Sequence, residues 1–412
     1  MTARIPFLLV AAFLSATPLA AQTFSETFDG GHSPTAPGPP LPWNSADWDV
    51  QTHVRSAQEK LGALDPHDAD HGPACEAPGE DGSVTHPVER IEDAVYQCAN
   101  HVMTSFRADD YGLIALTPPA LADFSQGEAT IEFDISSWSD SARDWFGVVL
   151  QPFDDQLPLP VVEWLPDLNG FGRRALHFDF GGGVICPVVY RDFEAAEGGD
   201  KFAGDCRWWD SWDGYFEPSA MARRTIRITV SRTRVRVEMP EVGLVWADMS
   251  VADLGWDQAV VSLVHHSYTP FKDGNGGPNT WHWDDVSIEP ARPLTILQAQ
   301  RRWANADGEA FVFPSGAPAG AMLRGSAIGT RLELSFDAGL SWQTAARQPS
   351  QKDSPVWQFL HPVPTGAREV RVRSGGVYPD WWSGGWIAKD LSLLAVEPPR
   401  GIRPSRSRRR SR

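Results

Sequence analysis

Two acidic side chains stand close together in the segment TIEFDISSW, which covers residues 130–138. Glu132 and Asp134 alternate with apolar residues, and this pattern predicts a β-strand whose polar side chains share one face. A pair of carboxyls is what retaining enzymes use to cleave glycosidic bonds, one as nucleophile and one as protonated acid. The competing interpretation is that Phe133 and its apolar neighbours pack inward while both acids face solvent.

Two further segments carry polar residues at the same spacing. His177 and Asp179 alternate with apolar residues in LHFDFGGG, and His282 and Asp284 do so in TWHWDDVSI. If these strands lie beside the one that carries Glu132, the three pairs line one groove. Such a groove would either hydrogen-bond sugar hydroxyls or perform acid–base chemistry.

Tryptophan is abundant, with 18 in the chain. The segment CRWWDSWDGYF places Trp208, Trp209 and Trp212 in a loop rich in Gly and Asp. Exposed indole rings stack on the apolar faces of sugars, and their N–H groups bond hydroxyls. The alternative is that these rings cap the ends of a β-sandwich as part of its core.

The N-terminus and the cysteines indicate export. Residues 1–21 carry an arginine, then an apolar run, then small residues, which is the layout of a secretory signal peptide. A secreted, periplasmic or extracellular location follows, and four cysteines there favour disulfides. Pairing of nearest neighbours would join Cys75 to Cys98 and Cys186 to Cys206, although three connectivities are open.

The charge balance restricts the partners. The net charge is −17, although the C-terminal residues 399–412 are rich in arginine. An acidic body argues against nucleic acid and favours a neutral or cationic ligand, or calcium. The tail is predicted to be disordered, and it either contacts an anionic surface or has no function.

The pattern along the chain predicts an all-β protein of two domains. Residues 22–290 form the large domain, residues 289–295 read as a linker, and residues 296–398 form a smaller β-sandwich. The best candidate for a short helix or turn is QTHVRSAQEKL, residues 51–61. Strands are predicted at 129–138, 144–151, 174–180, 183–190, 223–230, 232–239, 243–248, 259–267 and 280–288, and then at 310–313, 322–336, 357–361, 369–373 and 386–396.

Three segments of the chain resemble the concanavalin A-like lectin/glucanase superfamily. FSETFDGG (24–31) resembles its first strand, the hairpin at 223–239 its late strands, and TWHWDDVSIEP (280–290) its closing strand. The resemblance implies a large jelly-roll sandwich for the first domain. It extends over roughly two thirds of the chain and identifies no narrower family.

The resemblance also implies roles for particular residues. Glucanases of the superfamily carry a Glu-x-Asp-x-(x)-Glu strand, which would make Glu132 the nucleophile and Asp134 its partner. Serines occupy the place of the proton-donating glutamate, and this counts against hydrolysis. Members also bind a structural calcium ion, for which the matching residues would be Glu26 or Asp29, the backbone of Gly30 and Gly31, and Asp284 or Asp285.

One motif stands out in the small domain. Residues 335–342 read SFDAGLSW and resemble a single Asp-box, S-x-D-x-G-x-x-W. This motif implies a β-hairpin in which Asp337 bonds its own turn and Trp342 tucks inward. Its role is structural, and the single copy does not indicate a propeller of repeated blades.

The leading interpretation is a secreted protein that binds an extracellular glycan without catalysis. Its groove would use Glu132, Asp134, His177, Asp179 and His282, with the loop tryptophans as stacking platforms. One alternative is a glycoside hydrolase or polysaccharide lyase that acts on the same face. Another is a structural or adhesion protein of the cell exterior that has no convergent groove. Neither the sugar nor the oligomeric state follows from the sequence.

Overall fold

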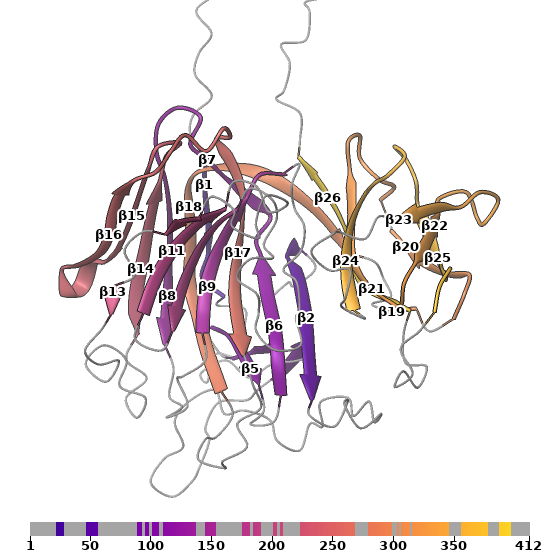
Figure 1. Cartoon of the computed structure of the whole chain (residues 1–412), viewed down its shortest axis with the longest axis horizontal. Helices are drawn as coiled ribbons and strands as arrows, with labels where there is room; N and C mark the ends of the chain where they lie inside the picture. The colour runs from indigo at the N-terminus through magenta and orange to yellow at the C-terminus, as the bar shows by residue number, and fades with distance from the viewer. Residues whose placement is uncertain are drawn as a thin grey trace, which may run out of the picture.

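In the part of the chain that the structure describes, β-strands are the dominant secondary structure (Figure 1). This computed structural model describes residues 22–28, 47–56, 89–92, 95–98, 101–106, 110–136, 145–153, 175–181, 184–190, 201–203, 207–208, 223–267, 279–298, 303–304, 306–313, 315–345, 356–377 and 387–396. Helical structure in these ranges is confined to short 3-10 turns such as η8 (Pro240–Val242). No helix in this part of the chain is long and apolar enough to cross a membrane.

The first sheet of the large domain is antiparallel. Its neighbours follow the order β3–β4–β5–β18–β8–β14–β15–β16, and β1 also pairs with β18. The strands are β1 (Gln22–Glu26), β3 (Glu89–Glu92), β4 (Val95–Gln97), β5 (Val102–Phe106), β8 (Ala129–Ser136), β14 (Arg224–Val230), β15 (Arg234–Met239), β16 (Leu244–Ser250) and β18 (Asn279–Gln298).

The second sheet is also antiparallel, in the order β2–β6–β17–β9–β10–β11, with β12 and β13 both paired to β11. A short strand, β7, pairs with β17 and with β18 and so joins the two sheets. The strands are β2 (Asp49–Ser56), β6 (Asp110–Thr117), β7 (Ala120–Asp123), β9 (Trp145–Gln151), β10 (Leu176–Gly181), β11 (Val184–Tyr190), β12 (Lys201–Ala203), β13 (Arg207–Trp208) and β17 (Gln258–Ser267).

Apolar side chains from both sheets meet between them and form one core. The ring of Phe146 in the second sheet lies 4.6 Å from that of Trp281 in the first, measured between centroids, and stacks on Phe180 at 4.8 Å. Each fully buried side chain of this size contributes about 1.5–3 kcal/mol relative to exposure. The large domain is therefore the jelly-roll sandwich that the sequence predicted.

The small domain is a second sandwich, as predicted. Its third sheet contains β19, β21, β24, β26 and the C-terminal part of β18, and its fourth sheet has the order β20–β25–β22–β23. Trp357 and Phe359 lie in the core between them. The strands are β19 (Trp303–Ala304), β20 (Glu309–Val312), β21 (Met322–Ile328), β22 (Leu332–Ser335), β23 (Gln343–Ala345), β24 (Val356–Pro362), β25 (Glu369–Ser374) and β26 (Ala388–Val396).

The linker predicted at residues 289–295 is wrong, because β18 runs through it without interruption and belongs to both domains (Figure 1). Prolines suggested the break, since a proline lacks the N–H that a central strand needs. Pro290 falls between the segment that pairs with β8 and the segment that pairs with β7, a place where β18 changes partners. The missing donor therefore costs no ladder hydrogen bond to β8.

A buried polar contact fixes the two domains together. Asp49 on β2 forms an ion pair with Arg324 on β21, and both side chains are almost completely shielded from water. The Ser392 hydroxyl of β26 donates to Asp49 Oδ1 at 2.6 Å, and the Gln51 amide donates to Oδ2 at 3.2 Å. An apolar cluster that joins Val260 to residues of β26 lies in the same junction.

The helix or turn proposed for residues 51–61 is also wrong over the part that the structure describes. Residues up to Ser56 belong to β2, which pairs residue by residue with β6, and residues 57–61 lie outside the described part. The β-branched Thr52 and Val54 favour a strand, and the pairing with β6 decides the outcome.

The segment SFDAGLSW forms a tight turn, named here the Ser335–Trp342 turn. Asp337 accepts hydrogen bonds from the Ser341 N–H at 2.8 Å and from the Ser335 hydroxyl at 2.8 Å. Gly339 has a φ of 92°, a backbone conformation that favours glycine. The half-buried Trp342 ring lies beneath the Arg373 guanidinium, 4.1 Å from the ring centroid.

Candidate functional site

The outer face of the first sheet carries most of the acids that the sequence singled out. On β8, Ile131 and Phe133 point into the core, so Glu132 and Asp134 point away from it. On β18, Trp281 and Trp283 point inward, so His282 and Asp284 point outward with the β8 acids. The register places Asp134 opposite Asp284 on one side and opposite Thr225 of β14 on the other.

Glu132 is held by an ion pair. Its Oε2 lies 2.5 Å from Nε of Arg227 on β14, and Arg227 also contacts Glu238 on β15 at 3.4 Å. The chain of charges continues through Arg236, Asp248 and Arg234 across β15 and β16. The hydrogen bond to Glu132 raises the pKa of Arg227. This charge ladder fits the outer-face interpretation of Glu132 and leaves its carboxylate occupied.

A β-bulge in β18 builds the most perturbed part of this face. Pairing with β8 shifts between Asp284 and Ser287, and Asp285 has a φ of 46°. The Asp285 N–H donates to Asp284 Oδ1 at 2.9 Å, while Asp284 Oδ2 lies 2.7 Å from Nη1 of Arg223. The side chain of Asp284 is only 7% exposed, so its carboxyl at the bulge is shielded from water.

Burial and like charge shift the protonation of the two facing carboxyls. Desolvation raises the pKa of Asp284 to about 7, although the Arg223 charge opposes the shift. Desolvation also raises the pKa of Asp134, against a hydrogen bond of 2.7 Å from the Thr225 hydroxyl. Near neutral pH the protonated and ionised forms of Asp284 therefore coexist.

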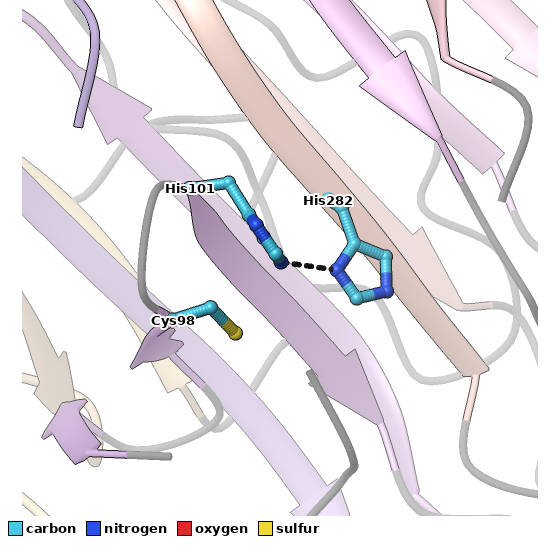
Figure 2. A group of neighbouring side chains, drawn as sticks. All are labelled: Cys98, His101 and His282. Atoms are coloured by element: carbon cyan, nitrogen blue, oxygen red, sulfur yellow. Dashed lines mark hydrogen bonds between the residues drawn. The ribbon is translucent and has the colours of Figure 1, made fainter. Parts of the chain in front are cut away.

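Two histidines, His101 and His282, face each other on the same sheet (Figure 2). Nδ1 of His282 lies 2.9 Å from Nε2 of His101, and both side chains are buried. Desolvation, together with the charges of His101 and Arg223, lowers the pKa of His282 well below its ordinary value. Cys98 lies next to them and is part of a disulfide.

The groove predicted to combine all three polar pairs does not form. His177 lies on β10 in the second sheet, where Leu176 and Phe178 point into the core, so His177 points away from it. The outer faces of the two sheets lie on opposite sides of the core, and this separates His177 from Glu132 and His282. Asp179 also lies on β10, although its side chain is outside the described part.

Other predicted site residues fall outside the described part. Trp208 lies at the end of β13, whose side chains are not described, and Trp209 and Trp212 lie outside. The same holds for Cys75 and Cys206 and for the side chain of Cys186, so the disulfide pairing stays a prediction. No described cysteine is free.

The calcium ligands do not come together among the residues that the structure describes. Glu26 Oε1 accepts the Phe28 N–H at 3.0 Å, and Asp284 is engaged by Arg223. Asp285 is the more exposed of the two β18 acids, with 55% of its side chain accessible. Asp29, Gly30 and Gly31 lie outside the described part. A calcium site around Asp285 would have to be completed by them.

Sequence reasoning missed the residues that hold the acids. Arg223, Thr225, Arg227 and His101 gain their roles from the pairing of β8 with β14 and of β18 with β5. The alternation in TIRITV showed that Thr225 and Arg227 share a wet face, but not which strand lies beside them.

Comparison with known proteins gives a likeness of fold. No protein-family model and no curated protein matches the chain. A glycosyl hydrolase family protein from Mycobacterium fortuitum is 14% identical, over 64% of this chain and 98% of that one, with a TM-score of 0.34. A beta-1,3-glucanase from Mycobacterium marinum is 14% identical over 64% and 97%, with a TM-score of 0.36. LamA of Z. galactanivorans, a variant in complex with laminaritriose and laminaritetraose, is 8% identical over 65% and 97%, with a TM-score of 0.36.

Identities and TM-scores this low assign no residue role and no activity to this chain. The resemblance predicted from the sequence is therefore one of sandwich architecture, which the sheet order of the chain itself displays.

Proposed function

We propose that the chain is an exported protein that binds a glycan without cleaving it. The observation that carries this proposal is that Arg227, Thr225 and Arg223 hold the three acids of the outer face. A retaining hydrolase needs one carboxylate free to attack and a second carboxyl protonated across the bond. A fixed array of paired donors and acceptors instead suits the hydroxyl groups of a sugar.

The ligand would contact the accessible members of this array. The side chains of Arg223 and Asp285 are 42% and 55% exposed. Asp134 and Thr225 lie on β8 and β14, the strands that follow β18 toward the β16 edge of the sheet. Trp208, Trp209 and Trp212 are proposed as stacking platforms. A calcium ion at Asp285 is proposed, with Asp29 as a further ligand.

A second candidate function is hydrolysis by the Asp134–Asp284 pair. The two residues are directly opposite in an antiparallel pair, which places their Cβ atoms roughly 4.5–5.5 Å apart. Asp284 is partly protonated near neutral pH, as a general acid must be. The ion pair with Arg223 and the burial of Asp284 favour binding over hydrolysis.

The decisive experiment measures retention and product release together. Purified chain from Gln22 onward would be run through native gels that contain laminarin, other β-glucans, or uronate polymers, with and without calcium. The same polymers would be analysed by mass spectrometry for released oligosaccharides. Laminarin comes first because a glucanase and a laminarin-oligosaccharide complex are among the similar structures.

Matched variants locate the site. We expect Arg223→Ala to weaken retention at least about fivefold, because it removes an exposed donor and frees Asp284. Arg234→Ala removes an arginine that is also exposed, at the far end of the charge ladder, and should leave retention unchanged. Oligosaccharide products that disappear in the Asp134→Asn variant would show that the site hydrolyses its ligand, and would overturn the proposal of binding alone. Neither products nor retention would favour the structural or adhesion role.

A further inference from the structure

Three side chains that bind metals well meet at the junction of β4, β5 and β18 (Figure 2). One ligand atom each from Cys98, His101 and His282 lies within 4.8 Å of the others, and all three residues are buried. In the described part of the chain, no other group of three His, Cys, Asp or Glu residues meets this condition.

Two of the three are close in sequence and joined by a backbone hydrogen bond. Cys98 and His101 have the spacing Cys-x-x-His, and the Cys98 N–H donates to the His101 carbonyl at 2.9 Å. The buried amide of Gln97 donates to the Cys98 carbonyl at 2.7 Å and to the Phe28 carbonyl at 3.0 Å. Short chelating spacings of this kind are typical of zinc sites, where a tight turn presents two ligands to one ion. These hydrogen bonds fix the backbone at Cys98 and His101 in the absence of a metal.

The third residue approaches from another strand. His282 Nδ1 and His101 Nε2 face each other at 2.9 Å, with room for one proton between them. Zinc holds imidazole nitrogens at about 2.0–2.1 Å, so a small separation of the rings would admit an ion. His282 Nε2 has no hydrogen-bond partner among the described residues. In a zinc-bound His282 this nitrogen carries the proton, and Asp284 follows two residues later on the same face.

The oxidation state of the Cys98 sulfur decides whether these three residues can bind a metal. Cys98 is disulfide-bonded in this structure, and a disulfide sulfur is not the thiolate that zinc requires. We propose that Cys98, His101 and His282 form a site for a divalent transition metal, of the zinc class, which opens when the Cys98 disulfide is reduced. This inference does not depend on glycan binding.

The chemistry balances with a dithiol as the reductant. The dithiol transfers two electrons and two protons to the protein disulfide, the S–S bond breaks, and the dithiol becomes a disulfide. Cys98 is then a thiol, which gives its proton to the buffer as the thiolate binds Zn²⁺. Three protein ligands leave a fourth position on the ion for water or another donor.

The test titrates the full mature chain with Co²⁺ and then Zn²⁺, before and after reduction and anaerobic removal of the reductant. We expect the reduced protein to bind one Co²⁺ with a thiolate-to-metal absorption band and tetrahedral visible bands, and Zn²⁺ to displace it. The oxidised protein should show neither band. A reduced protein without the thiolate band, or an oxidised protein that binds Zn²⁺ equally well, would overturn the proposal.

Variants separate the site from general thiol binding. Cys98→Ser, His101→Ala and His282→Ala should each weaken Zn²⁺ binding at least about tenfold in the reduced protein. His177→Ala removes a buried histidine from the opposite face and should change nothing. Equal affinity in all four variants would contradict the assignment.

A second set of variants avoids the reductant altogether. Changing Cys75, Cys186 and Cys206 to serine one at a time releases Cys98 in the variant that removes its partner. That variant should bind Zn²⁺ without reduction, and its circular dichroism spectrum would show that it is folded. If none of the three binds the metal, the proposal fails.

Discussion

Two aspartates in this chain have opposite protonation behaviour, and their surroundings explain why. Asp284 lies at the bulge of β18, where burial raises its pKa to about 7. Asp337 lies in the exposed Ser335–Trp342 turn, where hydrogen bonds from Ser341 and Ser335 lower its pKa to about 2. Both residues sit at irregular positions of a β-structure, and each has a neighbour with positive φ, Asp285 and Ala338.

The difference shows that the balance between burial and hydrogen-bond donors, and not the irregular backbone, decides the charge of each carboxyl. Asp337 accepts two N–H or O–H donors on Oδ1 alone and stays in water. Asp284 receives one backbone N–H and one arginine, but it loses most of its water and faces Asp134. Desolvation then outweighs the donors, and the neutral carboxyl becomes competitive.

A third aspartate, Asp49, extends the comparison to complete burial. Its substitution should cause the largest loss in the free energy of unfolding. Asp49 is fully buried with Arg324 as its partner, and burial lowers the pKa of Arg324 to about 9. Asp49→Ala leaves a buried guanidinium without its charge partner, and we expect a loss of about 3–5 kcal/mol in the free energy of unfolding. Urea denaturation followed by tryptophan fluorescence measures it.

The matched control removes both charges. Asp49→Leu combined with Arg324→Met should recover most of the loss, because no unpaired charge remains in the domain junction. Ser392→Ala removes one hydrogen bond to Asp49 and should cost only about 1 kcal/mol. If Asp49→Ala costs no more than Ser392→Ala, the ion pair does not fasten the two domains.

The next effect concerns the pH dependence that Asp284 creates. Its pKa is about 7 in the folded protein and about 3.9 when unfolded, so the folded state binds more protons between these values. The free energy of unfolding should therefore fall as pH rises from about 4 to 7, by about 1–3 kcal/mol. This change in the free energy of unfolding is smaller than the full difference between the two pKa values would give, because Asp134 and Asp284 titrate as a pair. Asp284→Asn should flatten this slope.

The measurement uses oxidised protein with a chelator present, melted at several pH values between 4 and 8. Asp285→Asn is the control, since it removes the adjacent, more exposed acid and should leave the slope in place. An Asp284→Asn curve parallel to that of the parent would refute the burial account of this carboxyl.

The charge ladder of the outer face should contribute less. Arg227 is 37% exposed and pairs with Glu132 and Glu238, so Arg227→Ala should cost up to about 1 kcal/mol. High salt should shrink that cost because it screens exposed charges. Arg232→Ala, which breaks an exposed pair with Asp253 outside the ladder, is the comparison, and an equal cost would show no network effect.

The strands themselves were predictable, because period-two alternation marks a strand that is buried on one face. TIEFDIS and TIRITV were placed within a few residues of β8 and β14, and Phe133 was correctly assigned to the core. β18 was cut short because its prolines resemble a linker, and β2 was misread because its partner β6 is sixty residues away in sequence.

The candidate site was only half predictable for the same reason. Asp134 and Asp284 could each be placed on a wet strand face, but their contact depends on register between residues far apart. The separation of His177 from that face followed from its sheet, and the sequence does not reveal which strands share a sheet. The bulge that shields Asp284 leaves no local signal, since Asp-Asp-Val is compatible with regular strand.

The smallest effect is expected at Asp337, because its turn is exposed to water. The pKa is about 2 when folded and about 3.9 when unfolded, so the stabilisation is present above pH 4 and disappears as pH falls toward 2. Exchange of the Ser341 amide hydrogen, which bonds Asp337, reports this locally. Asp337→Asn should exchange faster than the parent at pH 5, with the difference closing toward pH 2. The stability contribution of Asp284 should instead fall as pH rises from 4 to 7. If the contributions of both aspartates changed with pH in the same direction, burial and donor number would not govern these acids.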